Sequence, residues 1–209
     1  MQNTPQALMK YAVLFVILSV ALAARPVYLR INHTQNGEPF ALGKVVDSPD
    51  GTYDVKVTML RYYVSGITIQ HDGIETTLTN TYLLVDASKS PLYYLGDLNV
   101  NSVQSVKFSI GVPVVVNHED PSGYPIGHPL GHQEPSMHWG WAAGYRFVTF
   151  EGFAGRGATP TTPFQFHSLG DELYTPVFVA ASGVETDAAL EIPIRAEAMD
   201  LLTGIDATY

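Results

Sequence analysis

The chain has 209 residues, of which 46% are hydrophobic and 15% charged, and its 20 acidic and 11 basic side chains leave a net charge of −9. This apolar content can fill a core, which excludes a disordered chain, and the acidic excess excludes the phosphate-neutralising surface of a nucleic-acid binder. Cysteine is absent, which excludes disulfides, thiolate zinc sites, iron–sulfur clusters and cysteine-ligated blue copper.

The first 23 residues have the pattern of a secretory signal peptide. Lys10 precedes an apolar run over 11–23, and this run ends in the small-residue pattern Ala21-Leu22-Ala23. The run is shorter than the roughly 20 apolar residues that a membrane-spanning helix needs. We predict a signal peptide at 1–23 and a single domain at 24–209, exported to the periplasm, the cell surface or the medium. An uncleaved anchor or a buried helix is the alternative.

The remaining sequence predicts many short strands separated by turns. Alternating apolar and polar residues over 53–59, 105–112 and 188–195 are typical of half-buried strands. Runs that are apolar on both faces, at 62–69, 81–85, 145–150 and 177–181, predict strands covered on both sides. Asn36-Gly37 and Asp72-Gly73 predict tight turns. Pro193 favours a sheet edge because it cannot donate to a ladder, and residues 197–202 predict a short helix. This pattern is typical of an all-β antiparallel sandwich or barrel.

A long segment over 117–136 breaks the strand pattern with proline and glycine. Structureless loops of this length are uncommon in compact domains and often carry function. Four of the seven histidines lie in or beside it, His118, His128, His132 and His138. Imidazole is a common ligand for zinc, copper and nickel, so a loose metal-capturing site is one hypothesis. A polar loop without that function is the alternative, because the spacing matches no standard zinc motif.

The other histidines have different surroundings. His33 ends the first predicted strand, over 27–32, and His71 precedes a turn, where we expect it to be solvated. His167 follows Phe164, Gln165 and Phe166, and if the two phenylalanines face the core, His167 lies on the opposite face with Gln165. No nucleophile elbow or phosphate-binding loop is present.

Both tryptophans, Trp139 and Trp141, lie two residues apart just after the loop. In a strand they would share one face, and a hydrophobic plug beneath the loop is the simplest interpretation. The segment resembles the signature of the MbnP-like copper-binding protein domain family, Met-x-Trp-x-Trp followed by Gly-Tyr-x-Phe and Glu-Gly. The matching residues are Met137, Trp139, Trp141, Gly144, Tyr145, Phe147, Glu151 and Gly152.

Three more blocks of the family pattern occur in the same order, and the resemblance extends from about Val27 to the C-terminus. They are Leu60-Arg61-Tyr62-Tyr63-Val64-Ser65-Gly66-Ile67, Ile110-Gly111-Val112 with Asn117 after it, and Phe164-x-Phe166-His167-x-Leu169-Gly170.

The resemblance implies an exported antiparallel β-sandwich that captures copper or passes it on and is not itself an enzyme. Family members studied in methane-oxidising bacteria belong to copper-acquisition systems, in which a di-haem partner enzyme of the peroxidase type oxidises one tryptophan to kynurenine. Copper is therefore the implied cofactor, and a di-haem peroxidase-type enzyme and an outer-membrane transporter are the implied partners.

The resemblance also implies which residues form the site. His33 and His167 hold the family's first-strand and Phe-His-Leu-Gly positions and are the expected metal ligands. Trp139, with Trp141 second, is the candidate for the oxidised residue. His138 is an additional candidate ligand, and it departs from the family pattern, which usually carries an aromatic residue there.

Two other functions remain open at this stage. One is a metal-independent binding module, in which exposed aromatic rings such as Trp139 and Trp141 stack on a glycan or peptide. The other is a zinc- or copper-dependent enzyme, which needs three protein ligands and an open coordination position.

Overall fold

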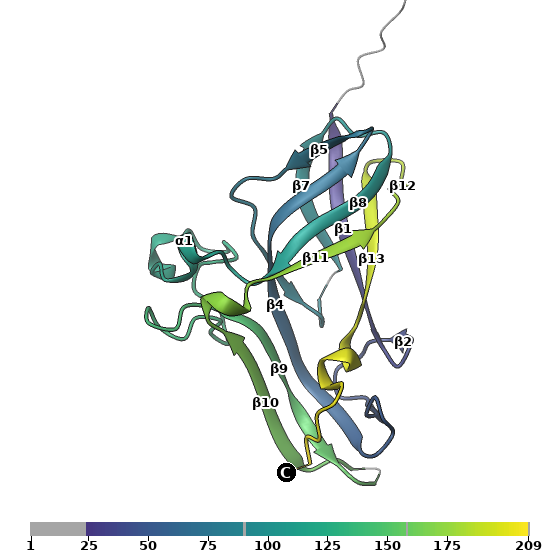
Figure 1. Ribbon diagram of the computed structural model, residues 1–209, viewed down its shortest axis with the longest axis vertical. Helices are drawn as coiled ribbons and strands as arrows, with labels where there is room; N and C mark the ends of the chain where they lie inside the picture. Colours follow the sequence, from purple (N-terminus) through teal and green to yellow (C-terminus); the bar gives the residue numbers. More distant parts are fainter. Residues whose placement is uncertain (1–23, 90, 158, 209) are drawn as a thin grey trace, which may run out of the picture.

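The computed structural model describes residues 24–89, 91–157 and 159–208, so the predicted signal peptide lies outside the described residues. Within these ranges the strands form two sheets that pack face to face, and an irregular lobe that carries α1 projects from one side (Figure 1). The predicted all-β sandwich is confirmed. The smaller sheet contains β1 (Arg25–Gln35), β2 (Glu38–Pro39), β7 (Leu92–Leu98), β12 (Val184–Glu185) and β13 (Leu190–Glu197).

The larger sheet is organised around one long strand, β4 (Asp54–His71), which pairs with five others. Its main path runs β10-β9-β4-β8-β11, and β3, β5 and β6 also pair with β4. The other strands are β3 (Val45–Asp47), β5 (Ile74–Thr77), β6 (Leu83–Asp86), β8 (Val103–Ile110), β9 (Arg146–Gly155), β10 (Thr162–Leu169) and β11 (Thr175–Ala180).

The predicted turns form where the sequence places them. Asn36 and Gly37 join β1 to β2 with φ angles of 51° and 79°, and Asp72 and Gly73 join β4 to β5 with 48° and 80°. Two successive positive φ angles are typical of the type I′ hairpin turn, which matches the twist of the flanking strands.

The segments 53–59 and 62–69, predicted as two strands, belong to the single strand β4. This long strand contains an irregularity: its register with β8 shifts between Ser65 and Thr68. Gly66 lies at that shift with φ of 61°, a conformation that costs glycine little.

The first and last long strands, β1 and β13, pair in parallel, whereas the other ladders among the described residues are antiparallel. Pro193 pairs with Arg30 on one side, and β12 reaches only Leu190 and Glu191 on the other. The missing proline N–H therefore faces an unpaired stretch of edge, as its chemistry requires.

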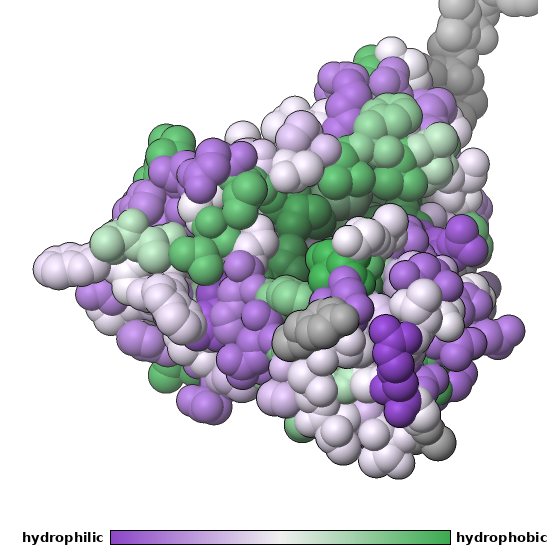
Figure 2. Space-filling view, turned by 60° about the horizontal axis from the view of Figure 1, so that its bottom comes forward, coloured by the Kyte–Doolittle hydropathy of each residue, from purple (hydrophilic) through white to green (hydrophobic). Residues whose placement is uncertain are grey.

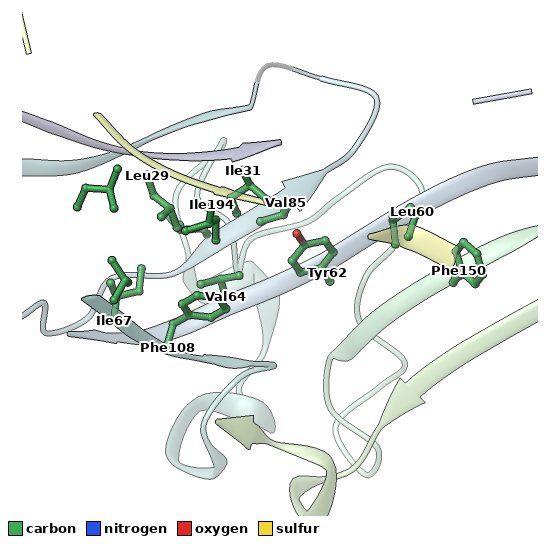
Figure 3. Close-up of a cluster of buried hydrophobic side chains, with 14 of the residues drawn as sticks. Leu29, Ile31, Leu60, Tyr62, Val64, Ile67, Val85, Phe108, Phe150 and Ile194 are labelled. Atoms are coloured by element: carbon green, nitrogen blue, oxygen red, sulfur yellow. The ribbon is translucent and has the colours of Figure 1, made fainter. Parts of the chain in front are cut away.

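The main core lies between the two sheets (Figure 3). Leu29 and Ile31 from β1 and Ile194 from β13 meet Val64 from β4 and Phe108 from β8. Each fully buried side chain of this size contributes roughly 1.5–3 kcal/mol through the removal of apolar surface from water.

A second buried cluster lies on the outer face of the larger sheet, beneath the lobe formed by residues 113–145, here called the loop lobe. This cover explains the residues at 62–69 and 145–150, which are apolar on both faces. The prediction of two-sided cover is wrong for 177–181, because β11 lies at the end of the sheet path and Phe178 is 64% exposed. The cluster consists of Tyr63, Val112, Leu130, Met137, Tyr145 and Phe147.

Helical structure is short wherever it occurs in the described ranges, and the predicted C-terminal helix is a 3-10 turn. No described helix has the length and apolar character needed to cross a membrane. The helical elements are α1 (Val114–Asn117) and the 3-10 turns η1 (Pro121–Gly123), η2 (Asp171–Leu173) and η3 (Ala198–Leu202).

Candidate metal-binding site

Asn117 holds the loop lobe in place on the larger sheet. It is fully buried, its Oδ1 accepts a hydrogen bond from the Tyr145 N–H at 2.9 Å, and its Nδ2 donates to Asp171 at 2.8 Å. Gly144 must be glycine, because an added Cβ would lie 2.4 Å from Asn117 Oδ1 and φ is 74°. The amide therefore fixes the end of α1, the start of β9 and η2 relative to one another.

The two tryptophans lie in a tight loop and not in a strand. A bridge between His138 and Tyr145 closes this loop, and the Trp139 N–H donates to the Gly144 carbonyl at 2.9 Å. Trp139 is 56% exposed and Trp141 is 82% exposed. The expected hydrophobic plug is therefore wrong for the indoles; Met137 fills that role, with 1% exposure.

His167 lies beside Trp139, with 6.0 Å between the ring centroids. Its Nε2 donates a hydrogen bond to Glu151 Oε1 at 2.7 Å, across the β9–β10 ladder. Because the carboxylate holds the proton on Nε2, the lone pair of the neutral imidazole lies on Nδ1. A carboxylate behind a histidine is the usual partner of metal-ligating imidazoles, since it orients the ring and raises its basicity.

Arg146 also contacts Trp139, with its guanidinium 4.1 Å from the ring centroid. Trp139, Arg146, Glu151 and His167 are here called the His167 corner. Burial lowers the pKa of Arg146, and the negative charge of Glu151 opposes that effect. The corner thus contains one cation, one carboxylate and one imidazole, and Glu151 offsets the repulsion that Arg146 would exert on a bound metal ion.

His33 lies between the sheets, apart from this corner. A hydrogen bond of 2.9 Å joins its Nε2 to the Tyr62 hydroxyl, and its ring packs 6.2 Å from Phe40. Burial lowers the pKa of His33, and Asp86 opposes that effect, so the imidazole is neutral near pH 7. It borders a hollow of about 220 Å³ lined mainly by apolar residues of both sheets. Figure 2 shows apolar residues gathered around a hollow on one face.

The register of the larger sheet separates the two expected ligands. Tyr62, the partner of His33, pairs with Val148 and faces the smaller sheet. His167 pairs with the next residue, Thr149, which faces the opposite, outer side, where its hydroxyl contacts the sulfur of Met137. Among the described residues no contact joins His33 to His167 or to either tryptophan.

His138 lies within the tryptophan loop, 4.8 Å from the ring centroid of Tyr145. Its Nδ1 accepts the Gly140 N–H at 3.2 Å, which leaves the proton on Nε2, and Nε2 is buried without a hydrogen-bond partner. Burial is the main cause that lowers the pKa of His138. In this arrangement neither ring nitrogen offers a free lone pair.

The other loop histidines are divided between structural contacts and solvent. His118 donates from Nδ1 to the Trp141 carbonyl at 2.7 Å and contacts Asp171 through Nε2, while His128 stacks on Tyr124. His118, His132 and His138 line one hollow of about 440 Å³ with Asp120. Nevertheless, within the described ranges no three His, Asp or Glu side chains are spaced to hold a metal ion together.

His71 is buried and not solvated as expected. It is 3% exposed, because its two ring nitrogens bond to Asp72 and Thr76 inside the β4–β5 hairpin. Glu151, Arg146 and Asn117 are site residues to which the sequence assigned no role. Only the Glu-Gly block hinted at Glu151; Gly152 follows it because a Cβ there would lie 2.4 Å from the Lys56 carbonyl.

Comparison with known proteins places the fold and the motif in a family. The family model described as MbnP matches residues 24–209. The structure resembles that of MbnP from Methylosinus trichosporium, with a TM-score of 0.53 and 23% identity over 69% of this chain and 62% of that one. This chain thus covers less than two thirds of the length of that protein, and at this identity the likeness shows the fold. A comparison with curated proteins gives no match. The extent of the family match shows that the chain belongs to the MbnP family.

Proposed function

We propose that the protein is an exported copper-binding protein that captures copper or passes it on, at a site built on His167 beside Trp139. The observation that carries the proposal is the Glu151–His167–Trp139 arrangement, in which a carboxylate fixes the imidazole and leaves Nδ1 as the donor atom. Neutral imidazole suits copper, and cysteine, the thiolate alternative, is absent from the chain.

A single imidazole does not complete a copper site, so further donors must join His167. The proposal assigns one of them to Trp139 after oxidation to kynurenine, whose ketone and aryl amine would lie beside the imidazole. The exposure of Trp139, 56%, supports access by a separate oxidising enzyme of the di-haem peroxidase type. Trp141 is the second candidate for oxidation, and His33 and His138 remain proposed ligands that would have to move to reach the corner.

The proposal places the mature protein in the periplasm or at the cell surface, with an outer-membrane transporter as the partner that receives or delivers copper. The role assigned here is transfer and not tight storage, because ligands gathered only on binding reduce the net affinity. We assign it no catalytic role.

Copper titration of purified protein tests the proposal. We expect His167→Ala to lower copper affinity by at least tenfold, since it removes the oriented donor, and Trp139→Phe to lower it in protein whose tryptophan is modified. His132→Ala tests the alternative copper site in the loop hollow, which His132 lines, and it should leave copper affinity unchanged. Peptide mass analysis reports kynurenine at Trp139 or Trp141. Equal affinities of His167→Ala and wild type would refute the site.

A further inference from the structure

A polar cavity of about 330 Å³ lies between the loop lobe and strands β6 and β7, away from the His167 corner. This volume is at the lower end of the roughly 300–1,000 Å³ that small-molecule sites occupy. Charged side chains and phenol rings dominate its lining, in contrast to the apolar hollow beside His33. The lining residues used below are Arg61, Asp86, Lys89, Tyr82, Tyr93 and Tyr94.

Arg61 is a buried cation with too few partners. The residue is 5% exposed, and its one short hydrogen bond runs from Nη1 to the Pro135 carbonyl at 2.9 Å. The contact from Nη2 to Gln133 is 3.5 Å, and Nε is 3.7 Å from Asp86 Oδ2 and has no hydrogen-bond partner. Burying a charge without full compensation is costly, so an acceptor in the adjoining cavity would stabilise the Arg61 guanidinium.

The charge balance of the lining residues alone is positive, with two cations and one carboxylate. Asp86 is the one carboxylate among the lining residues, and it faces two cations, Arg61 at 3.7 Å and Lys89 at 3.5 Å. Its other oxygen is taken by Ser88, at 3.0 Å from the amide and 2.6 Å from the hydroxyl. The remaining cationic charge fits an anion from solution.

The phenols add neutral hydrogen bonds and ring surface. The Tyr93 hydroxyl accepts the Asp86 N–H at 3.3 Å, which leaves its own proton free to donate. Tyr94 is 52% exposed at the rim, and its ring lies 5.4 Å from that of Tyr28 in a tilted arrangement. Two carboxylates outside the lining oppose its positive charge. Asp97 accepts a hydrogen bond from the Tyr94 hydroxyl, and burial together with the charge of Glu119 raises the pKa of Tyr82.

We propose that this cavity binds a small hydroxylated carboxylate of the size of one sugar acid. The Arg61 guanidinium and the Lys89 ammonium take the carboxylate, the Tyr93 and Tyr82 hydroxyls meet the ligand hydroxyls, and the rings cover its apolar edges. This binding is independent of copper, because none of the lining residues belongs to the His167 corner.

Calorimetric titration with D-glucuronate tests the proposal, with D-glucose, acetate and inorganic phosphate as comparison ligands. We expect saturable binding of glucuronate, and binding of glucose weaker by at least about tenfold, because a charged hydrogen bond contributes more than a neutral one. Lys89→Ala should weaken glucuronate binding about two- to fivefold, since the ammonium is largely exposed. Lys44→Ala removes the same charge from an exposed loop and is the matched control, expected to leave binding unchanged.

Arg61→Gln should weaken glucuronate binding by about thirtyfold or more, with thermal melting as the check on folding. Because that buried position affects stability, the surface pair Lys89→Ala and Lys44→Ala decides the question in folded protein. The proposal is overturned by undetectable glucuronate binding, by equal binding of glucose, by equal effects of the two lysine substitutions, or by phosphate binding as tightly as glucuronate. Copper affinity of Lys89→Ala should equal that of wild type, so this proposal and the copper proposal can fail separately.

Discussion

Replacing Asn117 with alanine should release the loop lobe from the larger sheet. The substitution leaves the buried Tyr145 N–H without its acceptor at 2.9 Å and removes the 2.8 Å bond to Asp171. An unsatisfied buried donor costs about 1–3 kcal/mol, and the lost bond to a half-exposed carboxylate adds about 1 kcal/mol. We expect a loss of about 2–4 kcal/mol in the free energy of unfolding, or roughly 5–15 °C in Tm for a domain of this size.

Urea unfolding followed with two probes gives the measurement. Both tryptophans lie in the loop held by Asn117, so their fluorescence reports the loop lobe, while far-ultraviolet circular dichroism reports the sheets. Asn99→Ala is the control, because Asn99 is exposed, and it should change stability by less than about 0.5 kcal/mol. If Asn117→Ala matches Asn99→Ala by both probes, the anchoring argument is wrong.

Three other predictions follow from the same contacts. Gly144→Ala should destabilise the protein by about 2 kcal/mol more than Gly140→Ala. Both glycines have positive φ, but of the two only Gly144 would bring a Cβ against a buried side chain. Equal unfolding midpoints of the two variants would contradict this. Contact with Asp171 raises the pKa of His118, so the stabilising effect of this histidine is complete below pH 6.5 and is lost as pH rises through the raised pKa. His118→Ala should therefore lose more stability relative to wild type at pH 5.5 than at pH 8.5. A larger loss at pH 8.5 would refute this assignment. If the copper proposal holds, Glu151→Gln should reduce copper affinity about 10- to 100-fold, because the oriented imidazole loses its carboxylate, and an unchanged titration would exclude that role.

The fold was largely accessible from the sequence because strands and turns leave local signals. The alternation of apolar and polar residues at 53–59 and the two-residue turns at Asn36-Gly37 and Asp72-Gly73 depend on neighbouring residues alone, and the structure confirms them. The merging of two predicted strands into β4 escaped prediction, since Leu60 and Arg61 between them continue the ladder with β9, and this pairing leaves no local signal.

The site was accessible only in part. The two-residue period of a strand correctly placed His167 on the face opposite Phe164, and the family blocks identified the Trp139 segment. The same period puts His33 with the buried Leu29 and Ile31, on the inner side, whereas the family resemblance paired it with His167. Which of these positions meet across the molecule depends on strand order and on the path of the loop.

By itself the sequence determined an all-β chain with closely spaced turns, two-sided burial of β4 and the start of β9, and a conspicuous Trp139 segment. Each of these follows from periodicity, turn chemistry or a short motif. Tertiary structure alone decided that Glu151 orients His167, that Asn117 anchors the tryptophan loop, and that Arg61 lies buried beside a polar cavity. These contacts join residues far apart in the chain, and they exist only after ladder register and loop path bring side chains of the right parity to the same face.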